Sequence, residues 1–339
     1  MDYRDALDTT ARAIADSITT PRVPSPDFVR AAIGPNDGRS WPHGPSAVPA
    51  SKERSAEFLA TTGRPSDEVI GRVEQLRREV TVEFAANSAA QAGCLPEQFP
   101  VVLAAWDALM LERAVVDGSW QITSGRAPLI VVNGPVRHRL GFSSAAGAMG
   151  PGFRANAAVA RAIELIVFNA YGVRAPVFER TMHGSPGRWA MCLAENEEQS
   201  PWEPLSTDGG LSPETDGVSA TLVRSFDFID NRDVRDPDSL LADLADTIVR
   251  TDSPAFGNAS AGIILCPEHA RLLGEAGMTK YDVRRWLERD ADLASDPMIV
   301  VANVRSTGIS TVVRLVTRWS HVTARVEQLR IAEVKEIHP

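Results

Sequence analysis

Cysteine and long hydrophobic runs are both scarce in this chain of 339 residues. Its three cysteines, Cys94, Cys192 and Cys266, stand far apart and do not form the even-numbered framework of a disulfide-rich secreted domain, so we expect a cytoplasmic protein. The longest apolar runs, 127–132 and 297–302, are far shorter than the roughly 20 residues of a transmembrane helix. The charged amino terminus is unlike a signal peptide, and we expect no membrane association.

An excess of basic charge is also missing. The 35 lysine and arginine residues face 44 aspartate and glutamate residues, for a net charge of −9, whereas a nucleic-acid-binding surface needs a basic excess. Neither a GxGxxG nor a GxxxxGK[ST] motif occurs, so there is no nucleotide signature, and HExxH and CxxC pairs are absent. The GxSxG turn of α/β-hydrolases is absent as well. These absences predict no nucleic-acid partner and no dedicated zinc site, and they argue against an ordinary α/β-hydrolase.

What the chain does contain is an alternation of short apolar strands with helical patterns. Apolar segments at 127–132, 261–266 and 297–302, and a mainly apolar one at 309–316, predict buried strands. Helices are expected at 53–62, 66–76, 83–92, 96–111 and 153–171, among others. This alternation predicts an α/β fold with a mixed, largely parallel sheet and flanking helices.

Residues 1–52 differ from the rest in composition. A helical pattern at 2–18 is followed by seven prolines between residues 20 and 51, which predict an extended arm. Such an arm either wraps a neighbouring subunit or is a poorly ordered connector. With the seven tryptophans it favours a homo-oligomer. The α/β domain is expected at 53–339, and a further division is left open, into 53–205 and 206–339.

The strongest candidate binding element is a glycine-rich loop at 141–152, which lies between an apolar strand that ends in Asn133-Gly134-Pro135 and the helix at 153–171. Glycines allow backbone N–H groups to approach a ligand, and a helix N-terminus favours an anion such as a carboxylate or phosphate. The alternative is a structural loop that packs the helix on the sheet. The candidate substrate-binding residues here are Asn133, Gly134, Ser143, Ser144, Gly150, Arg154 and Asn156.

A second candidate is an acidic segment in which Glu195, Glu197 and Glu198 precede Trp202, a further candidate substrate-binding residue. Packed carboxylates raise each other's pKa or require a cation between them. Glu195 or Glu197 is therefore predicted to be a general base, and Glu195 and Glu198 are weak candidates for metal ligands. His183, in a glycine-flanked turn, is a candidate base or ligand. An acidic surface turn is the alternative, and a divalent metal stays open as a cofactor.

Two thiols precede helices that begin with proline. Cys94 lies just before Pro96, and Cys266 lies just before Pro267. A helix N-terminus lowers the pKa of a nearby thiol, so Cys94 is a candidate nucleophile or redox thiol. The alternative for each is a small buried apolar residue.

The chain resembles an uncharacterised bacterial family whose members often carry, or lie beside, a small thiol or selenocysteine module with a (Sec/Cys)-Gly-Ser-Cys motif. The matching stretches are 67–71, 87–100 (NSAAQAGCLPEQFP), 129–134, 147–156, 183–192, 194–205 (AENEEQSPWEPL) and 267–277. The resemblance adds Asn87 to the candidate substrate-binding residues and implies a separate thiol protein as a partner. The chain itself lacks the Gly-Ser-Cys module and the family's Trp-Thr-Asp-Gly-Leu-Pro motif.

Together these features predict an enzyme that acts on a small anionic organic substrate by acid/base, lyase-type or redox chemistry. Its pocket is expected between the loop at 141–156 and the acidic segment at 195–202, with Arg154 and the loop amides holding the anion. The alternative is a non-catalytic partner subunit of a separate thiol or selenol enzyme.

Overall fold

The structure is a computed structural model that describes residues 51–73, 77–111, 126–150, 152–171, 187–188, 190–251, 260–303, 308–316 and 323–327. The chain divides into two compact units, Met1–Val48 and Pro49–Pro339, and every described residue belongs to the second. The predicted helix at 2–18, the proline-rich arm up to residue 50 and His183 lie outside the described residues. None of the helices in the described ranges is long and apolar enough to cross a membrane.

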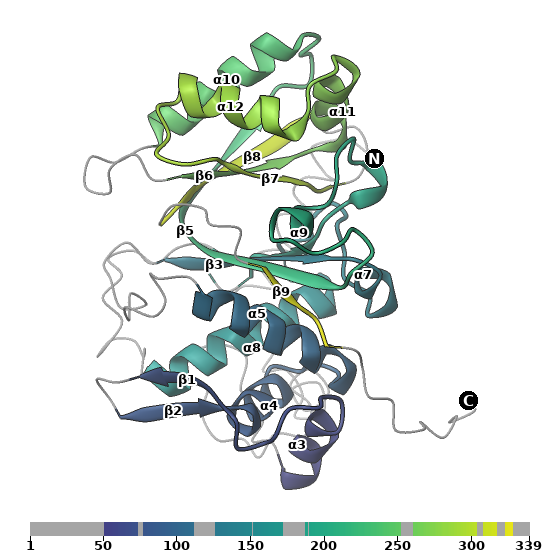
Figure 1. The fold of residues 1–339 in the computed structure, drawn as a ribbon, viewed down its shortest axis with the longest axis vertical. Helices are drawn as coiled ribbons and strands as arrows, with labels where there is room; N and C mark the ends of the chain where they lie inside the picture. The colour runs from purple at the N-terminus through teal and green to yellow at the C-terminus, as the bar shows by residue number, and fades with distance from the viewer. Residues whose placement is uncertain are drawn as a thin grey trace, which may run out of the picture. The chain divides into compact units, whose positions relative to one another are not determined.

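A mixed sheet forms the centre of the second unit and confirms the predicted α/β class (Figure 1). Its order is β4-β3-β5-β8-β6-β7, and β9 pairs with β5. The strands are β3 (Ala127–Asn133), β4 (Cys192–Ala194), β5 (Gly217–Asp230), β6 (Ala261–Leu265), β7 (Met298–Val301), β8 (Ile309–Leu315) and β9 (Thr323–Arg325).

Within this class the balance of strand directions differs from the expectation. Only β3 with β4 and β6 with β7 run parallel, whereas the pairs of β5 with β3, β8 and β9, and of β6 with β8, are antiparallel. The expectation of a largely parallel sheet came from apolar strands. Such strands report burial on both faces, and here antiparallel strands are buried on both faces as well.

The sheet curls because β5 is long enough to pair with different strands at its two ends, so that it belongs to both halves of the sheet. Its first residues pair with β3 and β9, and its last residues pair with β8. Alternate residues of β3 face different cores: Ile130 packs in one cluster with helices, and Leu129 packs in another cluster with Val300 of β7 and Val313 of β8. The second cluster is therefore a central apolar layer between the two halves of the sheet.

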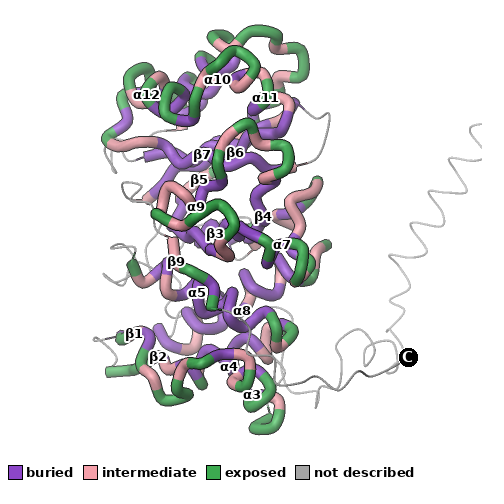
Figure 2. Tube along the Cα trace, turned by 45° about the vertical axis from the view of Figure 1, so that its right-hand side comes forward, coloured by how far each residue is buried: buried purple, intermediate pink, exposed green. Residues whose placement is uncertain are grey.

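Helices cover the outer face of each half (Figure 1). On the half built from β3, β4 and β9 they are α3 (Lys52–Leu59), α4 (Val82–Gln91), α5 (Phe99–Leu111) and α8 (Arg154–Tyr171), with the hairpin of β1 (Val69–Val73) and β2 (Arg78–Thr81). On the half built from β6, β7 and β8 they are α10 (Pro237–Arg250), α11 (Pro267–Glu275) and α12 (Lys280–Asp290). Figure 2 shows that the strands of the main sheet are largely buried and that the exposed residues lie mainly on the outer helices, the connecting loops and the β1–β2 hairpin.

Short helical elements lie between the main helices and strands along the chain. They are η2 (Pro96–Gln98), α7 (Val136–Arg139), η4 (Glu197–Gln199) and α9 (Leu205–Asp208). Proline occupies the first turn of η2, α10 and α11, and Thr279 forms a capping box with Asp282 at the start of α12. These local start signals agree with the sequence expectation because each depends on a few neighbouring residues.

Candidate functional site

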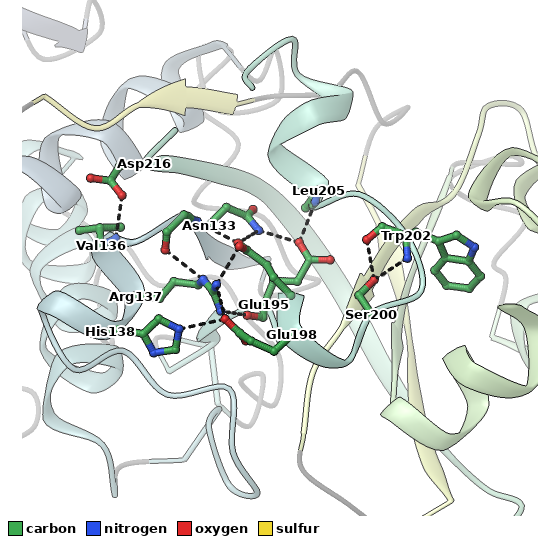
Figure 3. Close-up of polar contacts among 12 residues, drawn as sticks. Asn133, Val136, Arg137, His138, Glu195, Glu198, Ser200, Trp202, Leu205 and Asp216 are labelled. Atoms are coloured by element: carbon green, nitrogen blue, oxygen red, sulfur yellow. Dashed lines mark hydrogen bonds and ion pairs between the residues drawn. The ribbon is translucent and has the colours of Figure 1, made fainter. Parts of the chain in front are cut away.

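Arg137 of α7 gathers the acidic segment (Figure 3). Its Nη2 lies 2.7 Å from Oε2 of Glu197 and 2.9 Å from Oε1 of Glu198. Its Nη1 donates to the backbone oxygen of Glu195 at 2.7 Å, and its Nε donates to the oxygen of Gly134 at 3.0 Å. The cation that packed carboxylates require is thus a buried guanidinium from the same chain.

The Asn133–Gly134 turn holds two of these carboxylates from the other side. The Asn133 Nδ2 donates to Oε2 of Glu195 at 2.6 Å and to Oε1 of Glu197 at 2.9 Å, and the Gly134 N–H also donates to Glu197. Gly134 has φ +84, and a Cβ there would lie 2.6 Å from the Thr215 oxygen, so the turn requires glycine. The structure therefore brings Asn133, Gly134, Glu195 and Glu197 together as the sequence predicts.

Glu195 is the most deeply buried of the three carboxylates, with 1% of its surface exposed. Its Oε2 accepts hydrogen bonds from Asn133 and from the Leu205 N–H, whereas its Oε1 is buried without a hydrogen-bond partner. Burial raises the pKa of Glu195, and the nearby Lys280 ammonium only partly opposes the rise. This side chain is suited to carry a proton at a pH where an exposed glutamate is ionised.

Glu198 has the opposite character. Hydrogen bonds from Arg137, with a further one from His138, lower the pKa of Glu198 to about 2. Its side chain is about half exposed, and its carboxylate is engaged by both partners. Glu198 is therefore a permanently charged anchor for Arg137, which does not suit proton transfer near neutral pH.

The side chain of Asn156 of α8 holds the glycine-rich loop through hydrogen bonds. Its Nδ2 donates to the backbone oxygens of Ser143, Cys192 and Ala148, at 2.8, 3.0 and 3.3 Å, and its Oδ1 accepts from the Ser143 N–H at 2.9 Å. The Ser143 hydroxyl accepts from the Ala145 N–H. Both side chains thus shape the loop.

Other candidate binding residues also have partners within the chain. The Arg154 guanidinium donates to the Gly93 oxygen at 3.2 and 3.1 Å, Asn87 accepts from the Ser55 hydroxyl, and the Trp202 indole donates to the Met278 oxygen at 2.9 Å. The Ser144 oxygen accepts from the Asn303 N–H at 2.6 Å. None of these four lines the cavity beside the loop.

That cavity has a volume of about 330 Å³ and lies between the loop and the sheet. Gly150, a predicted binding residue, is in its wall, and none of the wall residues carries a charge. The wall consists of Ala145, Gly147, Ala148, Met149, Gly150, Leu193, Phe228, Ile264, Ala302, Asn303, Ile309 and Thr311. The loop therefore borders a mainly apolar cavity of a size suited to a small organic ligand.

The acidic segment lies next to this cavity and contributes no carboxylate to its wall. Leu193 of β4 is in the wall, and Glu195 follows directly after the end of this strand, where its N–H donates to the Val132 oxygen of β3 at 3.1 Å. The Asn196 Nδ2 donates to the oxygen of Asn303, another wall residue, at 2.7 Å. The loop and the acidic segment thus meet at the end of β7 and belong to one region.

Cys94 and Cys192 lie in an apolar cluster, and the Cys266 Sγ accepts a hydrogen bond from the Ser310 hydroxyl. Burial raises the pKa of the Cys94 thiol to about 12, and it also raises the pKa of Cys192 and Cys266. All three are buried. The expectation of a lowered pKa at Cys94 and Cys266 is therefore wrong, because desolvation outweighs the effect of the following helix.

Within the described ranges, no group of three or more histidine, cysteine, aspartate and glutamate side chains could hold a metal ion. Five residues of the acidic cluster and the cavity wall were not predicted as site residues from the sequence: Arg137, His138, Phe228, Asn303 and Thr311. Arg137 and His138 follow the Asn133–Gly134 turn directly, so a search for cations near the turn could have found them. No sequence motif marks the others.

No protein-family model matches the chain, and neither the curated proteins nor the solved structures include a significant match. The resemblance to the thiol- and selenol-associated family therefore stays a prediction.

Proposed function

We propose that this protein is an enzyme that binds a small organic substrate in the cavity beside the glycine-rich loop and acts on it by acid/base chemistry. The observation that carries the proposal is the cavity of about 330 Å³, which is walled by the loop and by residues of the four strands β4, β5, β6 and β8. Ligand sites in proteins are typically such mainly apolar hollows with a few polar groups.

Glu195 is the proton carrier in this proposal. It belongs to the acidic segment, whose Asn196 donates to the oxygen of the wall residue Asn303. The pKa of Glu195 is raised by burial, and its Oε1 has no hydrogen-bond partner. A neutral carboxylic acid with a free oxygen can donate a proton to a substrate that reaches from the cavity toward the acidic segment. The buried thiols, with their raised pKa values, are less suited to such a role.

Ligand-detected NMR with a library of small neutral and anionic fragments tests the binding site. Ala145 is in the cavity wall and partly exposed, whereas its neighbour Ala146 is exposed and outside the wall. The variant Ala145→Phe should fill the cavity and abolish fragment binding, and the matched control Ala146→Phe should leave it unchanged. Equal binding by wild type and Ala145→Phe, with unchanged melting temperature, would contradict the proposal.

The role of Glu195 is tested once a substrate is in hand. Glu195→Gln keeps the shape and the hydrogen-bond acceptor but cannot release a proton, so it should abolish turnover while Kd stays close to wild type and the melting temperature does not fall. Retained turnover would remove Glu195 from the chemistry and leave the binding site untouched.

A further inference from the structure

The mouth of the loop cavity carries an exposed aromatic pair. Phe226 and Phe228 are two residues apart on β5, and their rings lie edge to face with centroids 5.8 Å apart. Phe228 is 63% exposed and is also a wall residue of the cavity. A large apolar side chain that is both exposed and part of a cavity wall offers a surface for a ligand.

Behind Phe228, the floor of the cavity is a row of side chains on neighbouring strands. Phe228 of β5 pairs in register with Thr311 of β8, and Thr311 pairs with Ile264 of β6. All three are in the wall. Side chains of directly paired residues lie on one face of the sheet, so an aromatic ring, a hydroxyl and an aliphatic side chain follow one another along the floor.

Among the described residues, the cavity wall offers no counter-charge for an anion. These wall residues include no lysine, arginine or histidine, and Arg154, the predicted anion holder, donates to Gly93 instead. A carboxylate that leaves water for such a wall loses its hydration without an ion-pair partner, which opposes binding. A neutral ligand avoids this cost, and Thr311 and Asn303 can offer it hydrogen bonds.

From this arrangement we infer that the ligand is a neutral, flat aromatic compound with one hydrogen-bonding group. Its ring packs against Phe228 at the mouth, and its polar group reaches Thr311 or Asn303 on the floor. The inference rests on the proposed binding site, and it replaces the anionic substrate expected from the sequence with an uncharged one.

Two probes of the same size and shape class test this inference, 2-naphthol and 2-naphthoate. Titration calorimetry near pH 7 should give a Kd for 2-naphthoate at least about tenfold weaker than that for 2-naphthol, because only the carboxylate pays an uncompensated desolvation cost. Phe228→Ala should weaken 2-naphthol binding at least about fivefold through loss of ring contact. The matched control is Tyr281→Ala, since Tyr281 is 64% exposed and lies outside this cavity.

Equal or tighter binding of 2-naphthoate would overturn the neutral class, and an unchanged Kd in Phe228→Ala would overturn the aromatic contact. Ala145→Phe must abolish 2-naphthol binding, and persistent binding would place the probe elsewhere and also overturn the inference. If neither probe binds to wild type, but other fragments bind to wild type and not to Ala145→Phe, the inference fails and the proposed binding site stands.

Discussion

Glu195 and Glu198 are three residues apart, yet their pKa values are displaced in opposite directions. Burial raises the pKa of Glu195, and hydrogen bonds from Arg137 lower that of Glu198 to about 2. When the pKa values of two neighbouring carboxyl groups are displaced in opposite directions, the group with the raised pKa can carry a proton and the other stays charged. The run of glutamates in the sequence indicated a special environment, but which residue would be neutral depends on burial and on Arg137, which the run itself does not specify.

The raised pKa of Glu195 predicts a pH-dependent stability. Below its ordinary value of 4.5 the folded and unfolded states are both protonated, and as pH rises toward the folded pKa the unfolded state ionises first. Wild type should therefore lose stability over this window relative to Glu195→Gln, by up to about 1.4 kcal/mol per pH unit. Urea unfolding of both proteins at pH 5 and pH 8 measures the difference.

Glu198→Gln is the control for this experiment. Because the folded pKa of Glu198 is lowered to about 2, its contribution is complete above the unfolded value and is lost only as pH falls through about 2. The stability difference between wild type and Glu198→Gln should thus be nearly the same at pH 5 and pH 8. A difference for Glu195→Gln that does not change with pH would show that Glu195 is ionised when folded.

Arg137 is predicted to be the main structural support of the acidic segment. Arg137→Met removes the guanidinium that donates to Oε2 of Glu197 and to the Glu195 backbone oxygen, at a cost of about 3 kcal/mol. The control is Arg139→Met, which removes a partly exposed pair with Asp216 worth less than about 1 kcal/mol. Denaturant unfolding compares the two, and equal losses would show that Arg137 is not a special support.

At the scale of single elements, strong local signals were sufficient in some places and failed in others. Helix starts at α10, α11 and α12 agree with their proline and capping residues. The helix expected at 66–76 is wrong, because Val69–Val73 is a strand that pairs with β2. The backbone oxygens of Ser66 and Glu68 accept hydrogen bonds from the first residues of α4, so tertiary pairing overrides the local capping pattern.

The glycine-rich loop depends on one side chain of α8, and this dependence can be measured. Asn156→Ala removes four hydrogen bonds and leaves buried loop groups unsatisfied, which should cost about 2–4 kcal/mol. The control Asn169→Ala, near the end of the same helix at a partly exposed position, should cost less than about 1 kcal/mol. Denaturant unfolding distinguishes them, and a cost for Asn156→Ala as small as the control's would show that the loop is held by other contacts.

At the scale of the second unit, the α/β class was predictable and the curl of the sheet was not. Apolar strands between helices define the class, whereas the curl follows from β5, whose two ends pair with different strands. The cavity is a product of that curl, since its wall combines the loop, Phe228, Ile264, Asn303 and Thr311. No local sequence pattern shows that such distant residues come together. Of the wall residues, Gly150 is the one that was predicted from the sequence as a binding residue.

The central claim is that the loop cavity is a ligand site. A crystal structure of the protein soaked with the tightest-binding fragment tests it most directly. We expect density for the fragment between Ala145–Gly150 and the row of Phe228, Thr311 and Ile264, with contacts to Leu193. Density for the fragment at another place, such as between Trp202 and Tyr281, with the loop cavity holding no fragment, would contradict it.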